Sequence, residues 1–450
     1  MMRFAGLVGA ALLVATAAFA EEAAEPLLKG EAAFGDWHAD RPGVRRLIRP
    51  EDLQPPFVTE SASNGPGVVE RPEEVKPILP AGFTAELIAS GLADSRVVRV
   101  APNGDLFVAN SRDNQIRVYR LAEGSADPAM KSIFASNLTR PYGIAFYPLG
   151  DNPQWVYAAN RNRVIRFAYR NGDLKAQGKP ETIVDNIPGK NHWTRDIAFS
   201  PDGKTLYLSV GSYSNVGEEG MGKEPDGGLD AWAKSKPLGA AWGMDEGRAN
   251  VLAFDPDGKN RRVVATGLRN CAGMTIQPAT GALWCVVNER DSLGDNVPFE
   301  FATTVREGGF YGWPWYYIGN NEDPRRKGER PDLAGKATIP DVLMQAHSAP
   351  LNIVFYDGKS FPPDYQGDAF VALHGSWNRG VRTGYKVVRL KFRDGKPTGE
   401  YEDFMTGFVV SDEEVWGRPV GVAVAKDGAL IVTEDGNGTI WRVTYSASRS

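Results

Sequence analysis

The sequence predicts an all-β protein, a six-bladed β-propeller with four-stranded blades and an extended N-terminal segment. Three observations support this prediction: a strand-opening motif that occurs six times, glycine-containing turns after it, and short β-branched or aromatic runs after those turns. Repeats at intervals of roughly 40–50 residues are typical of blades arranged around a central channel. The 450 residues are enough for one such domain.

Each motif copy is predicted to open the innermost strand of a blade, and most copies follow a cationic or imidazole side chain. The clear copies are Arg140-Pro-Tyr-Gly143, His192-Trp-Thr-Arg-Asp196, Arg269-Asn-Cys-Ala-Gly273 and Arg418-Pro-Val-Gly421, and weaker copies begin at Arg96 and Ser348. The residues before these strands should face the channel as a ring of arginines with one histidine. Such a ring favours an anionic ligand, and a carboxylate over a phosphate, because neither common glycine-rich phosphate motif is present.

The other strands and the insertions follow from turn signals and spacing. Turns such as 201–203 and 426–428 precede predicted second strands, 163–167 and 250–254 are predicted third strands, and 85–89 is a predicted outer strand. The motif anchors at 97, 143, 196, 273, 352 and 421 lie 46 to 79 residues apart. The longer steps predict insertions at 213–247, 291–345 and 379–384, and long insertions commonly build binding walls.

The N-terminus predicts export. Residues 1–20 combine Arg3, an apolar stretch from 4 to 19 and the small-residue site Ala18-Phe19-Ala20, which is typical of a signal peptide cleaved after Ala20. The alternative is an anchoring helix, but the apolar stretch is short and alanine-rich. We therefore expect a periplasmic or secreted protein that does not span the membrane after cleavage. Residues 21–80 form the predicted extended segment, and 81–446 the propeller.

The net charge and the cysteine content limit which partners and cofactors are expected. A net charge of −5 without a Lys/Arg-rich run argues against nucleic acid as a partner. The two cysteines, Cys271 and Cys285, flank a predicted hairpin, so they form either a disulfide or two buried thiols. Neither lies in a Cys-x-x-Cys-His motif, so no covalently attached haem is expected on this chain.

Two features could carry chemistry. His192, one of four histidines, precedes an inner strand, where a neutral imidazole can act as a general base; the alternative is a histidine bonded to a loop carbonyl. The loop from Asn288 to Asn296 is rich in oxygen ligands, with Asp291 and Asp295 as candidate side chains for Ca²⁺, although acidic loops are often only solvated.

The chain resembles the soluble sugar dehydrogenases that depend on pyrroloquinoline quinone, the glucose/sorbosone dehydrogenase family, and in particular its sorbosone dehydrogenase-like branch. The resemblance covers most of residues 80–445, and it rests on several blocks in the right order. These include Asn191-His-Trp-Thr-Arg195, Gly211-Ser-Tyr-Ser-Asn215, Gly267-Leu-Arg-Asn270, Asn288-Glu-Arg-Asp291, Gly308-Gly-Phe-Tyr-Gly-Trp-Pro314, His374-Gly-Ser-Trp-Asn-Arg379 and Gly417-Arg-Pro-Val-Gly421.

The resemblance implies a six-bladed enzyme that oxidises a sugar, polyol or sugar aldehyde, with the quinone and Ca²⁺ at the channel mouth. His192 corresponds to the general base, and Arg269 to the arginine that stabilises charge on a quinone oxygen. The implied cofactor contacts are Asn270, Asn288 and Arg418, and the implied Ca²⁺ ligands are the backbone carbonyls of Glu289 and Arg290. Electrons would pass to a separate acceptor, a cytochrome or a quinone.

Four positions depart from the glucose-oxidising members: Asn378 replaces a lysine, Val420 a second arginine, Asn191 an acid, and Ala272 a glutamine. We expect Arg140 or Arg379 to compensate in the cofactor pocket, and Asn378 stays a candidate cofactor contact. Two other functions stay open: a Ca²⁺-dependent lactonase or esterase, against which the arginines count, and a non-catalytic binding propeller.

Overall fold

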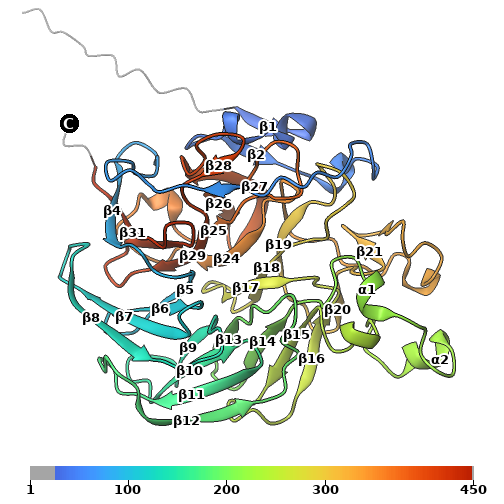
Figure 1. Ribbon diagram of the computed structural model, residues 1–450, viewed down its shortest axis with the longest axis horizontal. Helices are drawn as coiled ribbons and strands as arrows, with labels where there is room; N and C mark the ends of the chain where they lie inside the picture. Colours follow the sequence, from blue (N-terminus) through green and yellow to red (C-terminus); the bar gives the residue numbers. More distant parts are fainter. Residues whose placement is uncertain (1–25, 448–450) are drawn as a thin grey trace, which may run out of the picture.

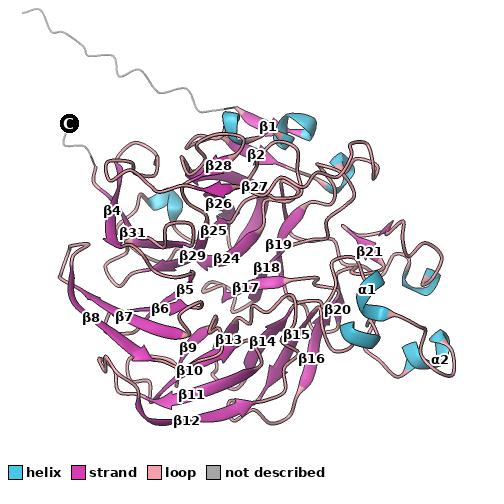
Figure 2. Cartoon of the chain, in the orientation of Figure 1, coloured by secondary structure: helices cyan, strands magenta, loops and turns pink. Residues whose placement is uncertain are grey.

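The computed structural model describes residues 26–447, and the predicted signal peptide lies outside them. The prediction of the fold is confirmed: six sheets surround a central axis as the blades of a propeller, with very little helix (Figures 1 and 2). Blade one contains β5 (Ser95–Val100), β6 (Leu106–Asn110), β7 (Gln115–Leu121) and β8 (Pro128–Ala135); blade two contains β9 (Ile144–Tyr147), β10 (Trp155–Asn160), β11 (Arg163–Ala168) and β12 (Gln177–Val184).

Blades three and five carry strands in addition to the four-stranded pattern, and blade four keeps four strands. Blade three contains β13 (Ile197–Phe199), β14 (Leu206–Val210), β15 (Asn250–Phe254), β16 (Arg262–Thr266) and the parallel β20 (Gly309–Phe310). Blade four contains β17 (Cys271–Ile276), β18 (Leu283–Val287), β19 (Glu300–Thr304) and β23 (Val342–Met344). Blade five contains β24 (Pro350–Phe355), β25 (Ala369–Leu373), β26 (Lys386–Arg393) and β27 (Lys396–Met405), extended outward by β2 (Arg45–Leu47) and β1 (Leu27–Lys29).

The last blade closes the ring with a strand from the N-terminal end of the domain. Blade six contains β29 (Pro419–Val424), β30 (Leu430–Glu434), β31 (Ile440–Tyr445) and, antiparallel to β31, β4 (Phe83–Ala89). The run at 85–89 is therefore an outer strand, as predicted. This pairing joins the two ends of the propeller domain in one blade and so closes the ring.

Short elements lie outside the blades. They are β3 (Gly67–Val68) paired with β28 (Glu414–Val415), β21 (Tyr316–Tyr317) paired with β22 (Asn321–Glu322), the helices α1 (Glu218–Met221) and α2 (Leu229–Lys234), and six 3₁₀ turns at 30–34, 37–39, 50–52, 243–245, 331–333 and 363–365. The helices and β21 form the lobe at one edge of the ring, which comes from the insertions predicted at 213–247 and 291–345 (Figure 1).

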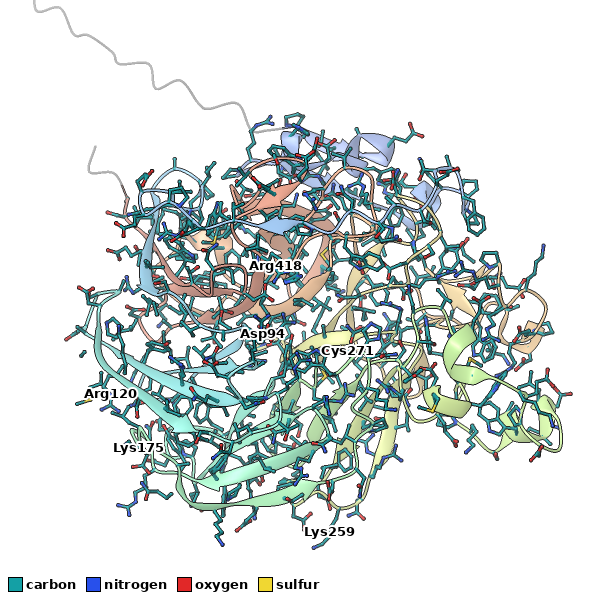
Figure 3. All side chains as sticks on the ribbon, viewed as in Figure 1. Asp94, Arg120, Lys175, Lys259, Cys271 and Arg418 are labelled. Carbon is teal, nitrogen blue, oxygen red and sulfur yellow. A yellow bond between two sulfur atoms is a disulfide. The ribbon has the colours of Figure 1, made fainter. Side chains whose placement is uncertain are left out.

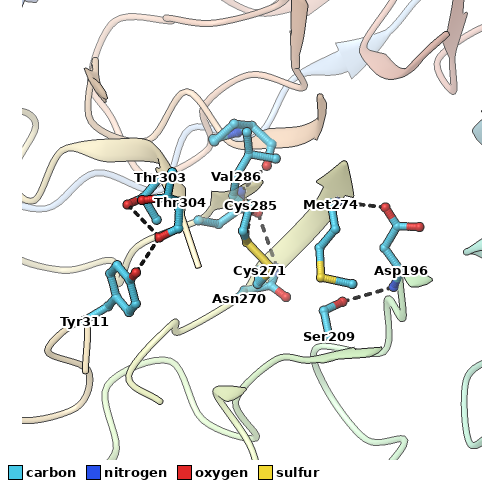
Figure 4. Close-up of a disulfide and its surroundings, with 12 residues drawn as sticks. Asp196, Ser209, Asn270, Cys271, Met274, Cys285, Val286, Thr303, Thr304 and Tyr311 are labelled. Carbon is cyan, nitrogen blue, oxygen red and sulfur yellow. Dashed lines mark hydrogen bonds between the residues drawn. A yellow bond between two sulfur atoms is a disulfide. The ribbon is translucent and has the colours of Figure 1, made fainter. Parts of the chain in front are cut away.

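The motif glycines are explained by how closely the inner strands approach one another. A Cβ atom on Gly143, Gly273 or Gly421 would lie 2.5 to 2.6 Å from a backbone oxygen of the next blade. These glycines belong to blades two, four and six, whereas the equivalent positions of blades one, three and five hold Val97, Asp196 and Asn352. Asp196 of blade three accepts a hydrogen bond from the Met274 backbone N–H at 2.8 Å (Figure 4).

A disulfide joins Cys271 to Cys285 across β17 and β18, with the two Cα atoms 5.8 Å apart (Figure 4). Both cysteines are buried near the centre of the ring, as the position of Cys271 in Figure 3 shows. The disulfide lies between the strand ends that carry Arg269 and Asn288. Across residues 26–447, no helix has both the length and the apolar character needed to cross a bilayer.

Candidate active site

A pocket of about 340 Å³ lies at the channel mouth, where the inner strands of blades three to five begin and their second strands end. The loops around β13, β14, β17, β18, β24 and β25 supply its walls. Its lining residues are Asn191, His192, Tyr213, Asn215, Arg269, Asn288, Glu289, Asp291, Glu300, His347, Ala349 and Trp377. Five of the sequence-predicted residues are thus brought together: His192, Arg269, Asn288, Glu289 and Asp291.

His192 is a half-buried imidazole with one nitrogen fixed. Its Nδ1 lies 2.9 Å from the Ser212 carbonyl oxygen and 3.0 Å from Ser212 Oγ. Because a carbonyl only accepts, Nδ1–H is the donor, and Nε2 keeps its lone pair. Burial, together with the nearby Arg269 charge, lowers the pKa of His192 to about 3. The loop-carbonyl bond is therefore present, and it sets the tautomer that a general base would require, so the general-base role of His192 stays a prediction.

Gly211 makes room for this arrangement. A Cβ atom there would lie 2.8 Å from His192 Cβ and 2.4 Å from Asn270 Oδ1. A side chain at this position would push the imidazole and the amide apart. Asn270 itself is buried, and its Nδ2 lies 3.4 Å from Asn288 Oδ1, at the upper limit of a hydrogen bond.

Arg269 ties two loops of the pocket together. Its Nη1 donates to the carbonyl oxygens of Asn288 and Glu289 at 3.1 and 2.7 Å. Its Nε and Nη2 donate to the backbone and side-chain oxygens of Asn215 at 2.9 and 2.7 Å. Among the lining residues within 26–447, Arg269 is the one arginine. It also lies 3.5 Å from Asp291, its nearest charged partner.

The pocket floor is acidic: Glu289 and Asp291 come from the loop predicted to be rich in oxygen ligands, and Glu300 was not predicted. Glu300, the first residue of β19, accepts a hydrogen bond from the Glu289 backbone N–H at 2.7 Å. Burial raises the pKa of Glu289 to about 7 and that of Glu300 well above its ordinary value. Burial also acts on Asp291, but hydrogen bonding to His347 and the Arg269 charge outweigh it and hold the pKa of Asp291 below its ordinary value.

The remaining predicted arginines and their neighbours have partners outside the pocket. Arg418 donates to Asp435 at 2.8 Å, near the centre of the ring (Figure 3). Arg140 is exposed and lies over the Trp193 ring at 4.9 Å. Arg379 donates to the backbone oxygens of Phe34 and Gly35, and Asn378 accepts from the Ser292 N–H at 2.8 Å.

The other predicted metal-loop residues are also engaged elsewhere. Arg290 pairs with Asp323 at 2.7 Å, and Asp295 accepts a hydrogen bond from the Gly380 N–H at 2.9 Å. Two of the positions that depart from the family pattern, Ala272 and Val420, pack with Leu351 in one small apolar cluster. The cofactor and metal roles of these residues stay predictions.

Sequence comparison identifies the family. The family model described as TrAA12-like matches residues 77–304 and 325–446. The chain belongs to the TrAA12-like family. An uncharacterized protein of Borreliella burgdorferi is 33% identical over 323 residues, which cover 69% of this chain and 77% of that protein. A pyrroloquinoline quinone-dependent pyranose dehydrogenase of Coprinopsis cinerea is 24% identical over 420 residues, which cover 80% of this chain and 53% of the relative, so this chain spans about half its length.

Solved structures of TrAA12-like relatives share the fold. The iodide structure of the Trichoderma reesei family AA12 enzyme gives a TM-score of 0.67 at 20% identity, covering 85% of this chain and 100% of that one. The holo form of the Coprinopsis cinerea pyranose dehydrogenase PQQ domain gives 0.67 at 21% identity, covering 84% and 99%. Residues 26–76 and 305–324 of this chain lie outside the family match.

Proposed function

We propose that the protein is an exported dehydrogenase that oxidises a sugar, polyol or sugar aldehyde with pyrroloquinoline quinone as the oxidant and Ca²⁺ beside it. The central observation is the pairing of a neutral imidazole, fixed by Ser212, with Arg269 in one polar pocket. Membership of the TrAA12-like family, and the names of the relatives from Coprinopsis cinerea, support the same choice.

The pocket chemistry fits a cation, which an anionic quinone would need between itself and the acidic side chains. Two buried oxygens, Glu289 Oε1 and Asn270 Oδ1, have no hydrogen-bond partner within the described chain, and both are acceptors. Unpartnered acceptors are satisfied by a cation or by ligand donors. Within residues 26–447, no group of three or more His, Cys, Asp or Glu side chains is arranged to hold a metal ion. Ca²⁺ here would therefore need backbone carbonyls, such as those of Glu289 and Arg290, and oxygens of the cofactor.

The proposed roles of the chain follow from these contacts. When bound, the quinone supplies the two-electron acceptor, and Ca²⁺ polarises it as a Lewis acid. His192 takes the hydroxyl proton of the substrate on Nε2, while Ser212 holds Nδ1–H and fixes the ring. Arg269 places its positive charge at the same pocket, where it stabilises negative charge that develops during the reaction. A separate cytochrome or quinone then takes the electrons.

The test is a titration of purified, metal-stripped protein with pyrroloquinoline quinone, with and without Ca²⁺, followed by visible absorbance and by dye reduction over a sugar panel. We expect saturable, Ca²⁺-dependent binding. His192→Ala should lower turnover about 10²–10⁴-fold and keep the cofactor bound. His38→Ala, at an exposed position, is the matched control. Absence of cofactor binding, or full activity of His192→Ala, would contradict the proposal.

One observation favours a second function, a Ca²⁺-dependent lactonase or esterase. Beside its three carboxylates, the pocket is lined by the amides of Asn191, Asn215 and Asn288, and by a single arginine within the described chain. Carboxylate and amide oxygens are the ligands that Ca²⁺ prefers. Hydrolysis of lactones by the quinone-free protein, dependent on Ca²⁺ alone, would support this function over the dehydrogenase.

A further inference from the structure

The N-terminal segment reaches the loops of the pocket, although it lies outside the match to the family. We call residues 57–64 the strap. The Phe57 N–H donates to the Leu293 carbonyl at 2.7 Å, and the Asp295 N–H donates to Thr59 Oγ1 at 2.8 Å. Further along, the Asn64 N–H donates to the Trp377 carbonyl at 2.7 Å. The strap therefore bonds to both loops that bring Asp291 and Trp377 to the pocket.

Trp377 is one of three exposed residues of its loop, with Gly380 and Val381, and among these three it alone lines the pocket. Its side chain is 48% exposed and lines the pocket, whereas Ser376, Asn378 and Arg379 are buried. An exposed indole that also lines a pocket offers a large apolar surface to a ligand bound there. Because Trp377 lies beside a pocket lined with polar groups, we expect a bound ligand to cover its indole.

The loop that carries Trp377 is rigidly held. The Ser376 N–H donates to the Thr383 carbonyl at 3.0 Å, which closes the base of the loop. Asn64 Nδ2 donates to the Gly380 carbonyl at 2.9 Å, and Asn64 Oδ1 accepts from Arg382 at 3.2 Å. One strap residue thus contacts the loop at three points. The backbone that carries Trp377 is therefore preorganised, and little of its conformational entropy is lost when a ligand binds.

The surroundings of Trp377 match the chemistry of a sugar. A sugar ring has an apolar face of C–H groups and a rim of hydroxyls. A flat indole buries the apolar face, and Asn191, Tyr213 and His192 of the same pocket can bond the hydroxyls. Tryptophan does this at low entropic cost because its side chain has only two rotatable bonds.

We propose that Trp377 is a substrate-binding residue that packs against the C–H face of the sugar, and that Asn64 of the strap is the positioning residue that holds it at the pocket mouth. This proposal rests on the proposed function, since it takes a sugar as the substrate. It adds the N-terminal segment, which the family match leaves out, to the substrate site.

The experiment compares four proteins: the wild type, Trp377→Ala, Trp377→Phe and Asn64→Ala, each loaded with pyrroloquinoline quinone and Ca²⁺. We expect Trp377→Ala to raise KM for the best sugar of the panel about tenfold, and Trp377→Phe to fall between it and the wild type. Asn64→Ala should raise KM by a smaller factor. Glycerol, which has no ring face, should show a much smaller change in KM. Val381→Ala, on the same loop, 39% exposed and not among the lining residues, is the control.

Cofactor affinity, read from visible absorbance, separates substrate binding from a disturbed cofactor site. A KM within twofold of the wild type in Trp377→Ala, or a loss of quinone affinity in place of sugar affinity, overturns the proposal. If Trp377→Ala does not fold, as thermal unfolding would show, Trp377→Phe decides the question for the indole. Asn64→Ala removes only the side-chain bonds to Gly380 and Arg382, so it tests the positioning of the loop.

Calorimetric titration of the quinone-free protein with glucose and xylose separates this proposal from the proposed function. Suppose that the wild type binds sugar but reduces no dye, and that Trp377→Ala abolishes the binding. This result would contradict the dehydrogenase function and support Trp377 as a sugar-binding residue. A wild type that neither binds nor oxidises any sugar would overturn both.

Discussion

Two buried charge clusters of this protein differ in their balance. The first joins the N-terminal segment to blade five: Arg46 and Lys386 each contact both Asp40 and Asp403, at 2.6 to 2.8 Å. The second is the pocket floor, where Glu289, Asp291 and Glu300 share one arginine, Arg269. In the first cluster two cations pair with two carboxylates and fix the N-terminal segment to blade five; we call this cluster the joint. In the second cluster three acidic side chains share one arginine, so acid is in excess there. Unpartnered buried atoms occur in both clusters, Arg46 Nε and Asp403 Oδ2 in the first and Glu289 Oε1 in the second, but of the two only the second lines the pocket at the channel mouth.

The largest effect is expected where the balanced joint is broken. Lys386→Met leaves two buried carboxylates with Arg46 alone, so the free energy of unfolding should fall by about 3–5 kcal/mol. Urea denaturation measures this change. Lys396→Met, at an exposed position of β27, is the control and should change stability by less than about 0.5 kcal/mol. A loss below about 1 kcal/mol in Lys386→Met would mean that the joint contributes little.

The fold could be predicted because its signals are local. The motif glycines, the turn residues and the β-branched runs each occupy a few consecutive positions, and Gly143, Gly273 and Gly421 are needed where neighbouring inner strands meet. The site was only partly predictable. His192 and Arg269 adjoin the motif, so their place at the channel mouth follows from the repeat.

The rest of the site depends on contacts between distant residues. Glu300 sits in an apolar strand and reaches the pocket through the Glu289 backbone. The partner of Arg379 is the Phe34 carbonyl, 345 residues away, and Trp377 is held by Asn64. No local pattern shows which arginines already have partners, so the sequence suggested a ring of arginines where the structure places one among the residues that line the pocket.

The second prediction tests the unbalanced floor through its pH dependence. Burial raises the pKa of Glu289 from an ordinary 4.5 to about 7, so the folded protein holds this proton more tightly than the unfolded chain. The associated stability is fully present below pH 4.5 and is lost as pH rises through 7. Glu289→Gln stays neutral, so its stability relative to the wild type should increase by up to about 3 kcal/mol between pH 4 and pH 8.

Urea denaturation of the metal-free protein across that pH range measures the Glu289→Gln difference. Glu307→Gln, whose carboxylate is 65% exposed in a surface ion pair with Arg262, should show a flat difference. A flat profile for Glu289→Gln as well would mean that water or a mobile cation already neutralises the floor.

The smallest effect, and the most specific, is the coupling between the two ligands. The acidic pocket floor should repel an anionic quinone that binds alone. Within the described chain Ca²⁺ finds too few side-chain ligands to bind tightly alone. Each ligand should therefore bind better in the presence of the other. We expect a coupling free energy of about 1–3 kcal/mol, seen as a rise in the thermal midpoint with both ligands that exceeds the sum of the separate rises. A chelator should remove the excess.

In Glu289→Gln, where the floor carries one charge fewer, the quinone alone should bind more tightly and the coupling should shrink. Equal, additive shifts in both proteins would show that the acidic floor does not govern cofactor binding, and the balance of charge would then have no functional meaning at this pocket.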